Sequence, residues 1–272
     1  MKRTLKTVYR QLFCNRVSYK FNNLLYECSL HGLGVMNYES SRVSGEAHFV
    51  QSALPRFLGD VAAPTFVDVG ANVGDYTRML SKQFPTSRIV SIEPHPKNFT
   101  KLQQSVSSNV TVVNAALGAE PGSTILFDRD DCDGSCHASV YEDVITDHHH
   151  QQTTSTNVTV DTLDAVVSRH GIQQIDLLKI DTEGHEREVL NGAKDVIASG
   201  AIKVLQIEFN ALNVYSRTFL RDFRLLLPNF QFYRLLPHSM IPIPTNTMKS
   251  EIFGFQNVVC VRDDLVSSRR AA

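Results

Sequence analysis

The sequence has no apolar segment that approaches the ~20 residues needed to cross a membrane, although 42% of its 272 residues are hydrophobic. Its first residues also lack the continuous apolar stretch of a secretory signal peptide. Five cysteines are too few and too scattered for a disulfide framework in a chain of this length. We therefore expect a reduced, cytoplasmic protein with a sizeable buried core.

The chain also has almost no net charge. Lys and Arg together number 27 and Asp and Glu number 28, which gives a formal charge of −1. Without an overall positive field the protein has no general attraction for nucleic acid, so we expect no nucleic-acid partner. The sequence has no internal repeat, and its length fits one large domain or two small ones.

The one local excess of charge lies at the N-terminus. Residues 1–26 contain six basic residues and no acidic one, and Leu5, Val8, Tyr9 and Leu12 have the spacing of an amphipathic helix. Such a helix usually packs its apolar face on a domain, and this is the interpretation that we favour. The alternative is a peripheral contact of residues 1–20 with the inner surface of a membrane, because a basic amphipathic helix can bind anionic lipid.

From residue 65 onward, short apolar segments alternate with segments of helical spacing. The apolar segments are 65–70, 88–94, 110–117, 175–181 and 202–210, and the helical ones are 75–84, 97–106, 159–171 and 186–200. This order predicts an α/β fold with a doubly wound, mostly parallel sheet. After a helical segment at 217–227, two strand-like segments follow each other directly, so we expect the last strand to be antiparallel.

The same reading divides the chain into parts. We expect an N-terminal helical extension over residues 1–60, one domain over 61–265 and a tail over 266–272. Residues 118–158 are polar and irregular, and we expect a long loop insertion there.

The segment VDVGANVGDY (67–76) predicts a ligand-binding turn. Asp68 ends a strand, and Gly70, Asn72 and Gly74 follow before a helix. In an open α/β sheet, ligands bind at the carboxyl ends of the strands. A dinucleotide fingerprint would read G-x-G-x-x-G, whereas this turn reads D-x-G-x-N-x-G. A leading carboxylate would repel a pyrophosphate but suits an ammonium or sulfonium group, which indicates S-adenosylmethionine rather than NAD.

Two further strand ends fit such a nucleoside. Glu93 ends the second strand, about 20 residues after the glycine turn, where a carboxylate can accept both ribose hydroxyls. Asn114 and Ala115 end the third strand, and their position predicts that they line the adenine.

The fourth strand ends in a cluster of titratable residues, within LLKIDTEGHEREVL (177–190). Asp181 lies at the strand end, Glu183 in the following turn, and His185 and Glu186 at the start of the next helix. Helix N-termini stabilise negative charge by ~0.3–1 kcal/mol, so some of these acids can be simple dipole partners. As catalytic candidates, we expect Asp181 nearest the reacting methyl group and Glu183 or Glu186 orienting the acceptor. The ordinary pKa of a histidine lies closer to neutrality than that of a carboxylate, so His185 is better suited than these acids to act as a base.

Together these motifs resemble the FkbM-type methyltransferases. The resemblance is carried by FVDVGANVGDYT, SIEPHPKNF, VNAALG, VDTLD and LLKIDTEGHEREVLNGA, over roughly residues 64–210. It implies the class I (Rossmann-like) methyltransferase fold, with a seven-stranded sheet whose last strand is antiparallel. It also implies S-adenosylmethionine-dependent O-methylation, commonly of sugar hydroxyls in polysaccharides, glycolipids or natural products. Residues 1–60 and 118–158 match no family motif, and acceptor specificity is expected there.

Other interpretations stay open. The acceptor can be a lipid, a peptide or another small molecule, and the chain can be a nicotinamide-dependent oxidoreductase or an inactive scaffold. Three carboxylates and a sugar diol could bind Mg²⁺ through oxygen ligands, but we predict no metal. A zinc site at Cys132, Cys136 and His137 lacks half of its ligands.

Overall fold

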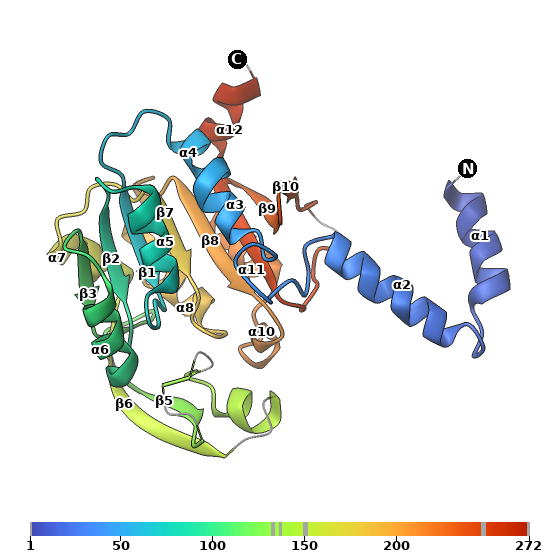
Figure 1. The fold of residues 1–272 in the computed structure, drawn as a ribbon, viewed down its shortest axis with the longest axis horizontal. Coiled ribbons are helices and arrows are strands. Elements are labelled where there is room, and N and C mark those ends of the chain that lie inside the picture. The colour runs from blue at the N-terminus through green and yellow to red at the C-terminus, as the bar shows by residue number, and fades with distance from the viewer. Residues whose placement is uncertain (1, 132–133, 136–137, 149–151, 246–248, 271–272) are drawn as a thin grey trace.

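The protein is built on an eight-stranded sheet, seen here in a computed structural model that describes residues 2–131, 134–135, 138–148, 152–245 and 249–270 (Figure 1). The strand order is β10-β9-β11-β8-β7-β1-β2-β3. The strands are β1 Thr65–Val69, β2 Arg88–Ile92, β3 Val110–Val113, β7 Leu177–Ile180, β8 Val204–Phe209, β9 Phe230–Leu236, β10 Ser239–Pro242 and β11 Gln256–Arg262. The segment with Cys132, Cys136 and His137 lies outside the described residues.

The sheet is mostly parallel, as predicted. Strands β3, β2, β1, β7 and β8 pair in parallel, whereas β11 is antiparallel to both β8 and β9. The antiparallel last strand is therefore confirmed. The expected count of seven strands is wrong for this chain, because the turn after β9 adds β10 as an antiparallel edge strand. The central strands are almost continuous apolar runs, since both of their faces are covered.

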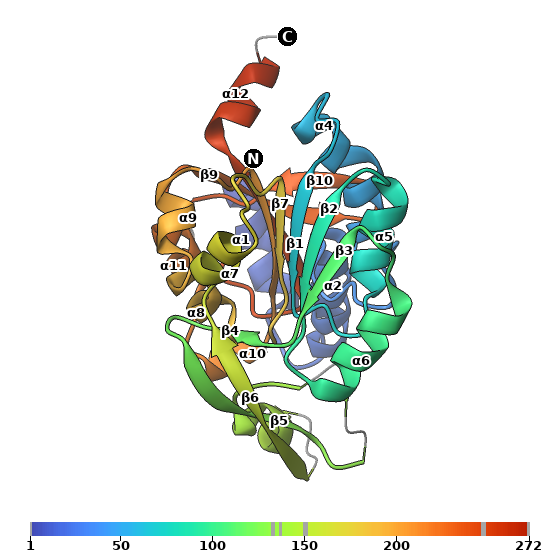
Figure 2. The ribbon, with the colours of Figure 1, turned by 90° about the vertical axis from the view of Figure 1, so that its left-hand side faces the viewer.

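Helices cover both faces of the sheet (Figure 2). One face packs on α7, α8, α9 and α11, and the opposite face packs on η1, α4, α5 and α12. The bounds are α3 Glu46–His48, η1 Phe49–Ala53, α4 Leu54–Leu58, α5 Asp75–Gln83, α6 Pro96–Ser105, α7 Leu163–Arg169, α8 Glu186–Asn191, α9 Lys194–Ala198, α10 Leu212–Tyr215, α11 Leu220–Leu226 and α12 Asp263–Arg270. The predicted tail from residue 266 thus begins inside a helix.

The segment expected to be an irregular loop contains a second sheet. Strands β4 Ala116–Leu117, β5 Gly122–Arg129 and β6 Thr153–Asp161 form a three-stranded sheet in the order β4-β6-β5, and the π-helical turn η2 (Val144–His148) lies between β5 and β6. The polar composition of this segment concealed the sheet, because most positions of both long strands are exposed or half-buried. In Figure 1 this small sheet lies beyond the carboxyl ends of the parallel strands.

The first 60 residues behave as two different parts. Helices α1 (Lys2–Phe13) and α2 (Tyr19–Gly32) have no buried residue and project away from the sheet (Figure 1). The expectation that the N-terminal helix packs on the domain is therefore wrong for the isolated chain. Residues 46–58, in contrast, belong to the core, since Phe49, Val50 and Leu54 are fully buried against the sheet. Within the described residues, no helix combines the length and apolarity needed to cross a membrane.

Candidate functional site

A cavity of about 600 Å³ opens at the carboxyl edge of the parallel strands. Its walls come from four places: the ends of the central strands, the small sheet, the chain after α2 and the chain before β11. The lining residues used below are Met36, Tyr38, Gly70, Asn72, Glu93, Ala115, Leu126, Asp181, Thr182, Glu183, His185, Glu208, Asn210, Phe253 and Phe255.

The glycine turn after β1 forms one wall because no side chain fits at its first glycine. Gly70 has a φ of 79°, and a Cβ placed on it would lie 1.7 Å from the carbonyl oxygen of Asp181. The turn can therefore lie directly against the end of β7. Gly74 has a φ of 90° and caps α5 away from the cavity, where a Cβ would lie 2.6 Å from the Leu102 side chain.

Glu93 is held at the end of β2 by the turn itself. Its two carboxylate oxygens accept hydrogen bonds from the backbone N–H groups of Asn72 and His95, both at 2.8 Å. Burial raises the pKa of Glu93 to about 7, and these two hydrogen bonds oppose the shift. Because a carboxylate offers about four acceptor sites, the side chain can still accept from a ligand's hydroxyls.

Asp68 lies behind the cavity and does not line it. Its side chain is 1% exposed, and Thr77 Oγ1 donates to it at 2.5 Å. Burial raises the pKa of Asp68 to about 6, while the positive charge of Lys179 opposes this change. The negative charge predicted for this turn is present, but it lies beneath the turn and has no direct contact with the cavity.

Of the other residues predicted to contact the cofactor, some line the cavity and others support it from behind. Ala115 lines the cavity, whereas Asn114 donates to the backbone oxygens of Glu93 and Pro94 and braces the end of β2. Asn72 lines the cavity, and its buried Oδ1 atom has no hydrogen-bond partner within the described residues. An unsatisfied buried acceptor is costly, so this atom fits a ligand that brings a donor, such as an ammonium group.

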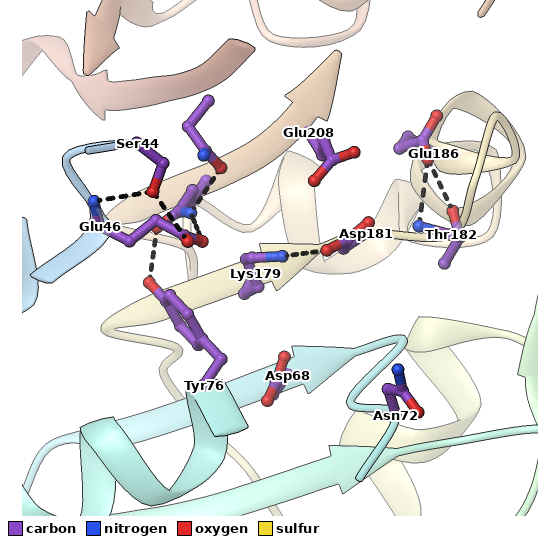
Figure 3. A network of polar contacts seen from close by, with 12 residues as sticks. Ser44, Glu46, Asp68, Asn72, Tyr76, Lys179, Asp181, Thr182, Glu186 and Glu208 are labelled. Carbon is purple, nitrogen blue, oxygen red and sulfur yellow. Dashed lines mark hydrogen bonds and ion pairs between the residues drawn. The ribbon is translucent and has the colours of Figure 1, made fainter. Parts of the chain in front are cut away.

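Asp181 forms an ion pair with a lysine that the sequence analysis did not single out. Lys179 is 3% exposed, and its Nζ atom lies 2.8 Å from Asp181 Oδ2 (Figure 3). Burial alone would lower the pKa of Lys179, but the carboxylates of Asp181 and Glu46 raise it overall. The lysine thus stays charged and fixes Asp181 at the edge of the cavity.

Three acids from two strand ends meet beside this ion pair. Carboxylate oxygens of Asp181, Glu183 and Glu208 all lie within 4.8 Å of one another, a grouping that could hold a metal ion. Burial, followed by the charges of Asp181 and Glu183, raises the pKa of Glu208 well above its usual value. The positive charge of Lys179 opposes this shift.

His185 also lines the cavity, from the start of α8. Its Nδ1 atom lies 3.3 Å from the hydroxyl of Tyr141, which comes from the chain between β5 and β6. Burial lowers the pKa of His185, and the charge of Glu188 opposes this shift. The imidazole is therefore neutral near neutrality and able to accept a proton.

Glu186 is placed differently from the other three candidates. It does not line the cavity, and its Oε1 atom accepts from the backbone N–H of Thr182 at 3.1 Å and of Gly184 at 3.0 Å. Its Oε2 atom accepts from Asn213 Nδ2 at 2.9 Å. The first two contacts hold the turn that carries Asp181 and Glu183, and the third joins this turn to α10. Glu186 therefore braces the turn and does not face the cavity.

A polar network beneath the site extends from the N-terminal region (Figure 3). Gln206 donates to Glu46 at 2.9 Å and accepts from the hydroxyl of Tyr76 at 2.5 Å. Lys179 lies 5.3 Å from the centre of the Tyr76 ring. The sequence signal for Lys179 and Glu208 was available, because each is a charged residue inside an apolar strand, where a lone charge is costly.

The sequence over this site matches a known family. The family model described as "Methyltransferase FkbM domain" matches residues 68–235, which is more than half of the chain. The chain belongs to the FkbM methyltransferase family. The match runs from Asp68 at the glycine turn to Leu235 in β9 and so contains the predicted cofactor turn and the acid cluster. The strand order with its inserted antiparallel strand is that of the class I methyltransferase fold.

Two curated proteins are similar over this region. "Methyltransferase 1" of Beauveria bassiana (strain ARSEF 2860) is 31% identical over 146 residues, which cover 47% of this chain and 58% of that protein. "Methyltransferase sdnD" of Sordaria araneosa is 25% identical over 158 residues, covering 48% of this chain and 61% of that protein. The chain therefore matches less than two thirds of the length of each.

Solved structures show more distant likeness. A putative O-methyltransferase from Klebsiella pneumoniae has a TM-score of 0.45 at 10% identity, with 94% of each chain covered. The plantazolicin methyltransferase BpumL in complex with SAH also has a TM-score of 0.45, at 8% identity, with 93% of each chain covered. The fold assignment rests on the strand order of this chain itself.

Proposed function

We propose that the protein transfers the methyl group of S-adenosylmethionine to a hydroxyl oxygen, namely a sugar hydroxyl of a polysaccharide, glycolipid or natural product. The observation that supports this is the convergence of Glu93, Asp181 and Glu208, from three strand ends, on one cavity. Glu93 would accept the ribose hydroxyls, and Asn72 Oδ1 would accept from the ammonium group. The sulfonium centre supplies an activated methyl group, and the protein supplies alignment and a proton acceptor.

Alignment and proton removal are the two tasks of this chain's residues. Holding an acceptor oxygen in line with the methyl group can contribute ~7–11 kcal/mol to lowering the barrier. A hydroxyl with a pKa near water's ~15.7 is a poor nucleophile. A positioned base adds about 10²–10⁴-fold. Asp181, fixed by Lys179, is our candidate for the group nearest the methyl, with Glu183 and His185 also within reach of the same space.

The composition of the cavity wall supports a sugar-bearing acceptor. Its lining includes the polar residues Glu208 and Asn210 as well as the aromatic residues Tyr38 and Phe253. Mixed polar and aromatic lining of this kind suits a polyol with an apolar side. We also propose a reducing, cytoplasmic setting, because the five cysteines are too few and too scattered for a disulfide framework.

The proposal is tested first by ligand binding and then by turnover. In calorimetric titration we expect S-adenosylhomocysteine to bind and NAD not to bind; the reverse would identify an oxidoreductase. In the second step, tritiated methyl transfer from the cofactor into fractionated glycans and lipids identifies the acceptor. Asp181→Asn should lose about 10²–10⁴-fold in turnover while its affinity for S-adenosylhomocysteine stays within about threefold. Unaltered turnover would exclude Asp181. EDTA should leave turnover unchanged.

A further inference from the structure

The N-terminal arm, defined here as residues 2–26, exposes an unusual amount of apolar surface. Among the described residues, 13 of the 18 exposed large hydrophobic side chains lie between residues 5 and 38, and ten of these are in the arm itself. Leu5 is 69% exposed, Leu12 61% and Val17 94%. Folded chains seldom leave such a surface uncovered unless a partner covers it.

The arm is also the most basic part of the chain. Leu5, Val8 and Leu12 share one face of α1, while Arg3, Lys6 and Arg10 share the opposite face. Arg16 and Lys20 continue the positive charge toward α2, and the first acidic residue is Glu27. A helix with one apolar face and one basic face matches the boundary between acyl chains and anionic headgroups.

The angle between α1 and α2 is set by specific contacts. The rings of Tyr9 and Phe13 lie 5.0 Å apart, and those of Phe13 and Phe21 lie 5.8 Å apart. The Tyr9 hydroxyl donates to Asn22 Oδ1 at 2.5 Å, and Asn22 Nδ2 donates to the backbone oxygen of Phe13 at 2.8 Å. These contacts therefore hold the two helices in a defined corner.

We propose that the N-terminal arm docks the protein on an anionic membrane surface. A second copy of the chain is the competing occupant of the apolar face. Charge argues against it, because two such arms would bring six basic residues of each copy together without one acid to pair with them. Anionic lipid headgroups, in contrast, neutralise every one of these cations.

The arm leads toward the cavity. A groove lined by Tyr26, Leu30 and Ile252 shares Met36, Tyr38 and Phe253 with the cavity at the carboxyl edge of the sheet. An acceptor with a lipid anchor could thus reach the site from the membrane side. This access route for the acceptor rests on the proposed function, whereas the membrane docking does not. It implies that the acceptor is an amphiphilic molecule.

Co-sedimentation of the full chain with vesicles tests the docking. We expect binding to vesicles containing phosphatidylglycerol, little binding to pure phosphatidylcholine, and weakening of binding as salt is raised. Leu12→Asp should weaken binding more than about tenfold, because it places a charge in the apolar face. Gln11→Asp, which adds the same charge on the polar face next to it, is the matched control and should stay within about threefold. Replacing Lys6 and Arg10 by Glu should also weaken binding more than about tenfold.

Several results would overturn the proposal: equal binding to neutral vesicles, equal binding by Leu12→Asp, or no vesicle binding together with a dimeric mass in light scattering. Each variant is also titrated with S-adenosylhomocysteine. We expect the same affinity for this ligand in every variant, because the arm has no contact with the cofactor end of the cavity. A chain that binds vesicles but not S-adenosylhomocysteine would refute the proposed function and leave the docking intact.

Discussion

At the scale of single residues, the site depends on acids whose neighbours decide their charge. Asp68 and Glu93 both have a raised pKa, of about 6 and about 7, with burial as the main cause. Only one of them, Glu93, faces the cavity. Asp68 and Glu93 look alike in the sequence, since each ends a strand, but their positions differ. Asp68 contributes charge from beneath the turn, whereas Glu93 can contact a ligand.

Glu93 should make cofactor affinity depend on pH. Its carboxyl must be ionised to accept both ribose hydroxyls, so affinity for S-adenosylhomocysteine should fall by up to about tenfold per unit as pH drops below about 7 and level off above it. Glu93→Gln should bind about 10–100-fold more weakly and show no such slope. Calorimetry across this pH range checks both, with the exposed Glu120→Gln as control.

The same group has a second pH effect, on stability. Because the folded-state pKa of Glu93 lies above its ordinary 4.5, the folded protein holds this proton more tightly than the unfolded chain. Stability from this group is therefore greatest below about pH 4.5 and is lost as pH rises toward 7. If the unfolding free energy of Glu93→Gln changed with pH as steeply as that of the unsubstituted protein, the assignment of this effect to Glu93 would be contradicted.

The Lys179–Asp181 pair should behave as a unit. Asp181→Asn leaves a buried ammonium without its nearest partner, and Lys179→Met leaves the acids without their cation, so each should destabilise the fold by about 3 kcal/mol. The double variant should lose less than the sum, with a coupling of about 1–3 kcal/mol. Urea unfolding of the four proteins measures this coupling, and strictly additive losses would show that the pair is not energetically linked.

At the scale of elements, the turn between β7 and α8 positions the acid cluster. Glu183 has a φ of 52°, an uncommon conformation that its surroundings must impose. Glu186 accepts from the turn's N–H groups and from Asn213 of α10, and so ties three elements together. The sequence pattern D-x-E-G-x-E thus has one acid that holds the turn in shape for the others.

Glu186→Ala should therefore impair both stability and turnover. We expect a loss of about 1–3 kcal/mol in unfolding free energy, since buried donors of Thr182, Gly184 and Asn213 lose their acceptor. Turnover should fall because Asp181 and Glu183 are displaced, while the affinity for S-adenosylhomocysteine changes little. Glu186→Gln, which keeps one acceptor oxygen, should restore most of both. If Gln rescued stability but no turnover, Glu186 itself would take part in the chemistry.

At the scale of the whole molecule, the core and the N-terminal arm should be separable. A chain lacking the arm, residues 2–26, should unfold at nearly the same temperature as the full chain, because neither α1 nor α2 contributes a buried residue. Leu54→Ala, in the segment that follows, should cost about 2–5 kcal/mol because Leu54 is fully buried. Thermal unfolding of both variants checks this division, and a large loss in the shortened chain would show that the arm supports the fold.

The sequence by itself determined the alternation of strands and helices, the glycine turn, the acid that ends β2 and the acid cluster after β7. Each of these is local: an apolar run, a Gly–Asn–Gly spacing or a charged residue at a strand end carries its own physical signal. The small sheet was not predictable in this way, because β5 and β6 are polar strands whose pairing is non-local.

Only the tertiary structure decided which acids face the cavity. Asp68, Glu93 and Asp181 all end strands at one edge of the sheet, yet Asp68 lies beneath the turn and Glu208, from a fourth strand, takes a place on the wall. The surroundings of a charged side chain at a strand end come from several elements, and here they include Glu46, from a segment far away in the sequence, whose charge acts on Asp68 and Lys179. Such long-range contacts leave no local pattern in the sequence. The sequence therefore identified most residues of the site, and only the fold showed how they are arranged.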